Sequence, residues 1–116
     1  MATPSITTKL PSSSAALVFG SFLHGSEPRD IDVLVLYDPS VFSPADAYRA
    51  HASFVKEVQR LVGLPVDLTL LTYGEEESSG FIEDTGAVPI EEAIEKLTSH
   101  STGPARKAAQ AGEFKR

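Results

Sequence analysis

Three aspartates and a glycine–serine turn are the residues of this chain that could do chemistry together. Asp30 and Asp32 lie two positions apart, and Asp67 follows later in the chain. Eight residues separate Gly20-Ser21 from Asp30. Residues two apart in a strand point to the same side, so Asp30 and Asp32 can share one ligand. Carboxylates brought together are costly unless a cation lies between them. Their hard oxygens favour Mg²⁺ or Mn²⁺, and two such ions can orient an attacking hydroxyl and stabilise an in-line displacement at phosphorus.

The Gly20-Ser21 turn can supply the groups that phosphate oxygens need. Glycine lets the backbone approach a ligand closely, and serine adds a hydroxyl donor. The nearby cationic side chains are His24 and Arg29, which could contact a phosphate. Each feature has an ordinary alternative: a strand-ending turn, a solvated histidine, an arginine paired with Asp30, and solvated acids at the start of a strand. The joint pattern, rather than any single residue, predicts nucleotide chemistry.

Three predicted strands position these residues. Residues 15–19 form a short apolar run that Gly20 closes, residues 30–37 are apolar beyond the two acids, and residues 66–71 form the third strand. An apolar run on both faces is typical of a central strand that is covered on both sides. If the third strand lies beside the second, all three carboxylates meet at one end of the sheet.

One helix is predicted between the second and third strands. Ser43 is a capping residue, Pro44 occupies the first helical position, and Gly63 ends the helix. Its apolar stripe includes His51, which we interpret as a packing residue. Residues 22–29 and 74–80 are interpreted as loops, residues 81–82 and 88–90 as short apolar pieces around a turn, and residues 91–99 as a short helix. This order predicts an α/β (α+β) fold, a small mixed β-sheet with helices packed on it.

Length and composition indicate one soluble domain. The chain has 116 residues, of which 41% are hydrophobic and 22% charged, and its net charge is -6. We expect an irregular N-terminal segment over residues 1–14, with a short turn at residues 12–14, a domain over residues 15–99 and a mobile tail over residues 100–116. The absence of cysteine excludes disulfides and thiolate metal sites and fits a cytoplasmic location.

Several function classes are disfavoured by the same sequence. No apolar run is long enough to cross a membrane, and the N-terminus does not have the pattern of a signal peptide. The acidic balance argues against binding along a nucleic-acid backbone, which needs clustered lysine and arginine.

The motif region resembles a known family. Residues 18–25 read Val-Phe-Gly-Ser-Phe-Leu-His-Gly and residues 30–35 read Asp-Ile-Asp-Val-Leu-Val. This is similar to the signature of the polymerase-beta-like nucleotidyltransferase superfamily, and more narrowly to its minimal nucleotidyltransferases. Gly25 matches a glycine common in the loop, Asp67 matches the third carboxylate, and residues 81–90 are similar to the family's final stretch.

The resemblance implies a nucleotidyltransferase fold and a role for each site residue. By that resemblance Gly20 and Ser21 would hold the triphosphate of a nucleoside triphosphate, with ATP as the default donor. Asp30 and Asp32 would bind two Mg²⁺ ions, or Mn²⁺, and Asp67 would bind the catalytic metal and help to activate an acceptor hydroxyl. NMP, by default AMP, would pass to that hydroxyl. The acceptor would lie on a partner protein, as in toxin–antitoxin pairs, or the site would be completed in a homo-oligomer.

Three departures from the family pattern favour other hypotheses. The loop before Asp30 is shorter than is usual in minimal members, and Phe22 stands where an arginine often follows Gly-Ser. The helix that usually precedes the first strand is missing or very short. The shortened loop and the missing arginine favour a non-catalytic binding or antitoxin module that keeps the fold and neutralises a partner by contact. A chance Asp-x-Asp in an unrelated α/β domain is the third alternative.

Overall fold

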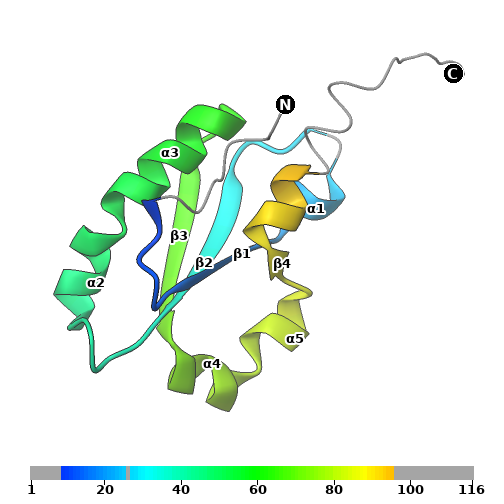
Figure 1. Ribbon diagram of the computed structural model, residues 1–116. Coiled ribbons are helices and arrows are strands. Elements are labelled where there is room, and N and C mark those ends of the chain that lie inside the picture. The colour runs from blue at the N-terminus through cyan, green and yellow to red at the C-terminus, as the bar shows by residue number, and fades with distance from the viewer. Residues whose placement is uncertain (1–8, 26, 96–116) are drawn as a thin grey trace, which may run out of the picture.

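A four-stranded mixed sheet organises the chain. The computed structural model describes residues 9–25 and 27–95, so the expectations for residues 1–8, 96–99 and the 100–116 tail lie outside the described residues. The strands run in the spatial order β3-β2-β1-β4 and comprise β1 (Ala15–Phe19), β2 (Ile31–Tyr37), β3 (Val66–Thr72) and β4 (Val88–Pro89) (Figure 1). β1 is antiparallel to β2 and β4, whereas β3 is parallel to β2. The three longer strands confirm the sequence prediction within one residue at each end.

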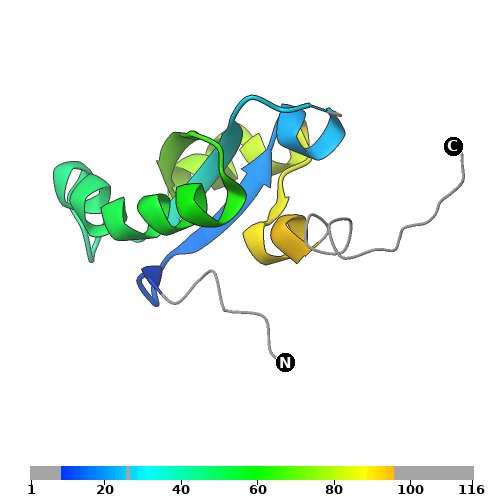
Figure 2. The same cartoon turned by 90° about the horizontal axis from the view of Figure 1, so that it is seen from above.

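Helices cover both faces of the sheet. They are α1 (Ser21–His24), α2 (Pro44–Ala50), α3 (Ala52–Val62), α4 (Tyr73–Ser79) and α5 (Phe81–Thr85), and residues 90–95 are also helical. Figure 2 shows α2, α3 and the 90–95 helix on one side of the sheet and α4 and α5 on the other. Among the described residues no helix is long and apolar enough to span a bilayer.

The main core lies between the sheet and the first of these helical layers. Phe54 and Val58 of α3 pack with Ile90, Ala93 and side chains of β1 and β2 in one buried cluster. β2 is the central strand: six of its seven residues are buried. Leu34, on the other face of β2, is also fully buried, and α4 packs against β2 and β3. The prediction of a strand covered on both sides is therefore confirmed.

Two segments predicted as loops are helical instead. Residues 21–24 form α1, one turn that begins directly after Gly20. The acidic segment forms α4 because Thr72 and Glu75 make a reciprocal capping box: the Thr72 hydroxyl accepts from the Glu75 N–H at 3.0 Å, and the Glu75 carboxylate accepts from the Thr72 N–H at 2.8 Å. Acidic residues in the first turn also stabilise the helix, because they lie near the positive end of its dipole. The Thr-x-x-Glu spacing was the signal that the loop interpretation missed.

The single helix predicted after Ser43 is two helices. Ser43 caps α2 as expected, its hydroxyl accepting from the Asp46 N–H, and Gly63 ends α3 in the left-handed conformation. The break falls at His51, which has non-helical dihedral angles and is fully buried. Its Nδ1 lies 2.6 Å from the Ala47 carbonyl and its Nε2 2.8 Å from the hydroxyl of Ser14. His51 thus joins the helical break to the N-terminal segment, where the predicted short turn is present.

We predict that Phe54→Ala destabilises the fold far more than Tyr48→Ala. Phe54 is fully buried in the main core, whereas Tyr48 on α2 is 64% exposed. Truncating a buried phenylalanine costs about 3–5 kcal/mol, and an exposed side chain away from special contacts costs within about 0.5 kcal/mol. Urea unfolding followed by circular dichroism measures both. Equal effects of the two variants would contradict the core described here.

Candidate functional site

The pairing of β2 with β3 places two of the predicted carboxylates side by side. Asp32 and Asp67 are register partners in the parallel ladder, so their side chains leave the sheet on the same face. The Ile31 N–H donates to the Pro65 carbonyl at 3.0 Å and fixes the start of this register. Asp32, on the central strand, is half-buried, whereas Asp67, on the edge strand, is exposed.

The third carboxylate lies just outside the strand and still interacts with the pair. Asp30 precedes the first residue of β2. The pKa of the Asp32 carboxyl is raised above its ordinary value, first by burial, then by the negative charges of Asp30 and Asp67, and finally by a hydrogen bond with Asp67. The three acids thus interact electrostatically, and the energetic cost falls on the ionised form of Asp32. A cation at Asp32 would relieve that cost.

Gly20 lies against this group. It precedes α1 with φ 81° and ψ −154°, a backbone conformation that is accessible essentially to glycine alone. A Cβ built on Gly20 would collide with an Asp32 carboxylate oxygen and lie 3.2 Å from the Asp32 Cγ. Glycine is therefore required here twice, by backbone conformation and by the closeness of a carboxylate. The Gly20 turn and Asp32 are therefore in contact, and their joint role in a nucleotide site stays a prediction.

The remaining predicted site residues lie in α1 and in the segment that joins α1 to β2. Ser21 opens α1 and is exposed, and its carbonyl accepts from the Gly25 N–H at 2.6 Å. His24 ends α1 and is exposed, as is Arg29. Within residues 9–25 and 27–95 no ion pair joins Arg29 to Asp30. Both side chains are thus open to solvent, and their contact with phosphate stays a prediction.

The three carboxylates are suitable ligands for a hard divalent cation, although they are not arranged around one common point. Asp30, Asp32 and Asp67 offer only carboxylate oxygens, the ligands that Mg²⁺ and Mn²⁺ prefer. Among the described residues, no three acidic, histidine or cysteine side chains are already disposed to hold a metal ion. Mg²⁺ commonly keeps several waters and uses one or two carboxylates together with substrate phosphates. Asp32 and Asp67 supply these one or two carboxylates, and the binding of a metal by all three acids stays a prediction.

An aromatic pair that sequence reasoning missed continues the row of acids. Phe19 is the register partner of Asp32 on the β1 side. Its ring meets that of Phe81, from α5, edge to face, with centroids 5.0 Å apart and planes at 89°. Phe19 directly precedes Gly20, which is the signal that could have marked it. Phe81 is 61 positions further along the chain than Gly20, so only the fold brings it here.

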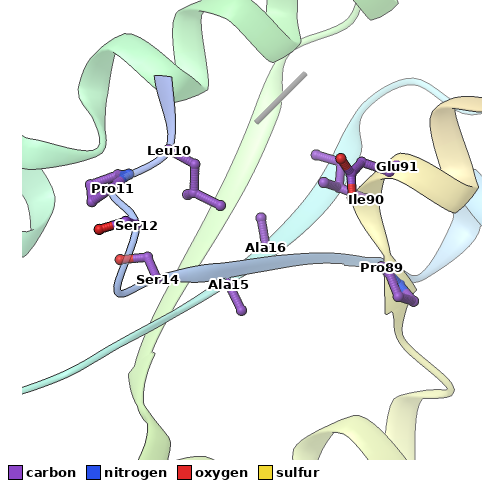
Figure 3. A pocket seen from close by; sticks show the side chains of 9 residues that line it. All are labelled: Leu10, Pro11, Ser12, Ser14, Ala15, Ala16, Pro89, Ile90 and Glu91. Atoms are coloured by element: carbon purple, nitrogen blue, oxygen red, sulfur yellow. The ribbon is translucent and has the colours of Figure 1, made fainter. Parts of the chain in front are cut away.

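A hollow at the other end of β1 is separate from the acids. It has a volume of about 510 Å³ and is lined by residues of the N-terminal segment, the start of β1 and the β4 region: Leu10, Pro11, Ser12, Ser14, Ala15, Ala16, Pro89, Ile90 and Glu91. Figure 3 shows Leu10 and Ile90 approaching it from opposite sides. Ala15 pairs with Leu36, near the end of β2, whereas Asp32 is at its beginning. The hollow therefore adds nothing to the carboxylate site.

A family model described as a nucleotidyltransferase domain matches residues 5–98, which span the Gly-Ser turn, all three acids and the aromatic pair. No curated protein matches the chain, and no solved structure does.

We predict that Gly20→Ala is costlier than Gly63→Ala because only Gly20 lies against a side chain. Both glycines have positive φ, but a Cβ at Gly63 meets nothing within 4 Å. Gly63→Ala should cost about 1–2 kcal/mol from the left-handed backbone alone. Gly20→Ala should cost more and should be partly rescued by Asp32→Ala, with a coupling of at least about 0.5 kcal/mol. Denaturant unfolding of the four variants measures the cycle, and strict additivity would refute the contact.

We predict that Asp32→Asn stabilises the protein in chelator-containing buffer at neutral pH. A raised folded-state pKa means that the carboxyl's contribution to stability is complete below its ordinary value of 3.8 and is lost as pH rises through the raised value. Removing the charge should therefore raise the melting temperature by a few degrees. Asp38→Asn is the matched control of opposite sign, because hydrogen bonds from Ser40 lower the Asp38 pKa. Thermal melts at several pH values decide, and destabilisation by Asp32→Asn would contradict the predicted repulsion.

Proposed function

We propose, from the premise that the chain belongs to the nucleotidyltransferase domain family, that it catalyses metal-dependent transfer of a nucleoside monophosphate to a hydroxyl acceptor. The single observation that carries this proposal is the Asp32–Asp67 register pair beside the Gly20 turn. By family resemblance the donor is ATP and the transferred group is AMP. Two carboxylates and a close backbone approach are what a metal-bound triphosphate requires.

Each site residue has a part in this reaction. The Gly20 turn and the Ser21 hydroxyl would bind phosphate oxygens, and His24 or Arg29 would add positive charge. Asp32 and Asp67, with Asp30 beside them, would hold Mg²⁺, which when bound neutralises charge on the transferring and leaving oxygens. Positioning and electrostatic stabilisation would supply most of the rate.

The bond changes balance without a further reactant. The acceptor hydroxyl oxygen forms a bond to the α-phosphorus, and the bond from that phosphorus to the bridging oxygen of the β-phosphate breaks. The electron pair of that bond leaves with pyrophosphate. The hydroxyl proton passes to the Asp67 carboxylate, which is exposed and can then release it to water. The products are the nucleotidylated acceptor, pyrophosphate and a proton.

The proposed acceptor is a hydroxyl on a partner protein, as in a toxin–antitoxin pair. The described residues form one sheet with its helical layers and contain no added helical domain of the kind that holds a small acceptor in larger relatives. Asp67 is exposed on an edge strand, where a large acceptor can reach it. Completion of the site by a second copy of the chain is the other form of this proposal.

A second candidate is a binding or antitoxin module without catalysis. It is favoured by the absence, among the described residues, of three side chains already disposed around a metal. On this alternative the fold neutralises a partner by contact alone, and the carboxylates are dispensable.

We predict that label from α-³²P-ATP with Mg²⁺ is transferred to the protein encoded beside this one, and that Asp32→Asn or Asp67→Asn removes the transfer. Losing a metal-binding carboxylate should cost several kcal/mol in the transition state, more than about a hundredfold in rate. Gel autoradiography measures the label, and co-purification measures the complex. Asp46→Asn, a surface acid paired with Arg49, is the control and should retain activity.

The outcomes separate the two candidates. Loss of transfer with the complex retained supports the enzyme. Neutralisation of the partner that survives Asp32→Asn, with no transfer by the unaltered protein, supports the binding module and would overturn the proposed activity.

A further inference from the structure

Aromatic side chains extend the row that the carboxylates begin. Asp67, Asp32 and Phe19 are successive register partners across β3, β2 and β1, and such partners lie side by side on one face of a sheet. Phe81 then packs edge to face on Phe19. Across this face the order is therefore carboxylate, carboxylate, aromatic ring, and α5 adds a second ring against the first. Both rings are half-buried, so neither is withdrawn into the core.

We propose that the Phe81 ring, supported by Phe19, is the surface on which the nucleobase of the bound nucleoside triphosphate stacks. This inference rests on the proposed function, because it assumes that the phosphates lie at Gly20 and the acids. In a nucleotide held there, the base lies about the length of one sugar away from the phosphates and the acids. On the β1 side of Asp32, the aromatic pair is the flat apolar surface at that position. Every nucleobase has a π-face, so a ring can bind it without reading its edges.

The fold holds Phe81 firmly enough for such a contact. Gly80 and Gly86, both in the left-handed conformation, bound the short helix α5. The Ile82 N–H donates to a Glu76 carboxylate oxygen at 3.0 Å, which ties the first turn of α5 to α4. The edge-to-face geometry is the favourable one for two aromatic rings and fixes the orientation of Phe81.

Calorimetric titration of Mg·ATP and of Mg·tripolyphosphate tests the proposal, because only ATP has a base. Phe81→Leu keeps an apolar side chain of similar size but removes the ring. We expect it to weaken Mg·ATP binding about tenfold or more, as loss of a base–aromatic stack does, and to leave Mg·tripolyphosphate binding unchanged. Phe81→Trp, which keeps a ring, should retain the affinity for Mg·ATP.

Phe42 offers a matched control for lost packing. It too makes an edge-to-face contact, with His51, at a centroid distance of 5.6 Å and an angle of 65°, but it lies in the segment after β2, away from the acids. Phe42→Leu should bind both ligands as the unaltered protein does. Loss of ATP affinity in Phe42→Leu as well, or equal loss of both ligands in Phe81→Leu, would overturn the stacking proposal.

The same titrations show which proposal fails. If the unaltered protein binds neither Mg·ATP nor Mg·tripolyphosphate, the proposed function fails and the stacking proposal fails with it. If the unaltered protein binds both and Phe81→Leu binds both equally well, the nucleotide site stands and the stacking proposal alone is refuted.

Discussion

The parallel pairing of β2 with β3 is the constraint on which the site depends. It sets Asp32 beside Asp67, and a slip of one residue would move Asp67 to the opposite face of the sheet. Parallel strands need a long crossover, which α2 and α3 supply here between Tyr37 and Val66. Burial of the α3 face in the main core therefore fixes the register as well as the stability. A residue such as Phe54 acts on the site at a distance, through the position of a strand.

The second constraint is the close packing of Gly20 on Asp32. The chain turns from β1 into α1 in a conformation that suits glycine, and the Asp32 carboxylate fills the space where a side chain would be. Backbone and carboxylate are thus brought together by the fold itself. The cost is electrostatic, since Asp32 is desolvated and faces two further acids. Because the central strand carries this electrostatic cost, we expect Asp32 to bind a cationic ligand rather than to have a purely structural role.

The sequence predicted the strands because they depend on local patterns, and it named the acids that two of these strands carry. Apolar runs marked β1, β2 and β3, and the i, i+2 spacing placed Asp30 beside Asp32. The helix of the acidic segment was missed, although Thr72 and Glu75 carried a capping-box spacing, because the acidic run and its two glycines outweighed it. The break at His51 could not be read at all, since it involves Ser14, a residue 37 positions away. Local helix propensity contains no information about such tertiary contacts.

The same limit applies to the site. The pairing of Asp32 with Asp67 follows from two strands that could be recognised one by one, whereas a shared site for all three acids stays a prediction. The Phe19–Phe81 contact depends on the register of β1 with β2 and on the place of α5, which no local pattern encodes. The departures from the family pattern, notably Phe22 in place of an arginine, stay relevant because they would weaken the proposed contacts to phosphate. A base-stacking surface on the β1 side would offset part of that loss, since affinity withdrawn from the triphosphate can be restored at the base.

The two acids of the register pair differ in a way that suits different tasks. Asp32 is half-buried on the central strand, between Phe19 and Asp67, whereas Asp67 is exposed on the edge strand. A carboxylate that is partly removed from water attracts a cation more strongly, because the surroundings screen the two charges less. An exposed one is open to a second reactant and can exchange protons with water. In the proposed reaction the nucleotide therefore lies toward β1, over the aromatic pair, and the acceptor hydroxyl approaches from the open edge at β3.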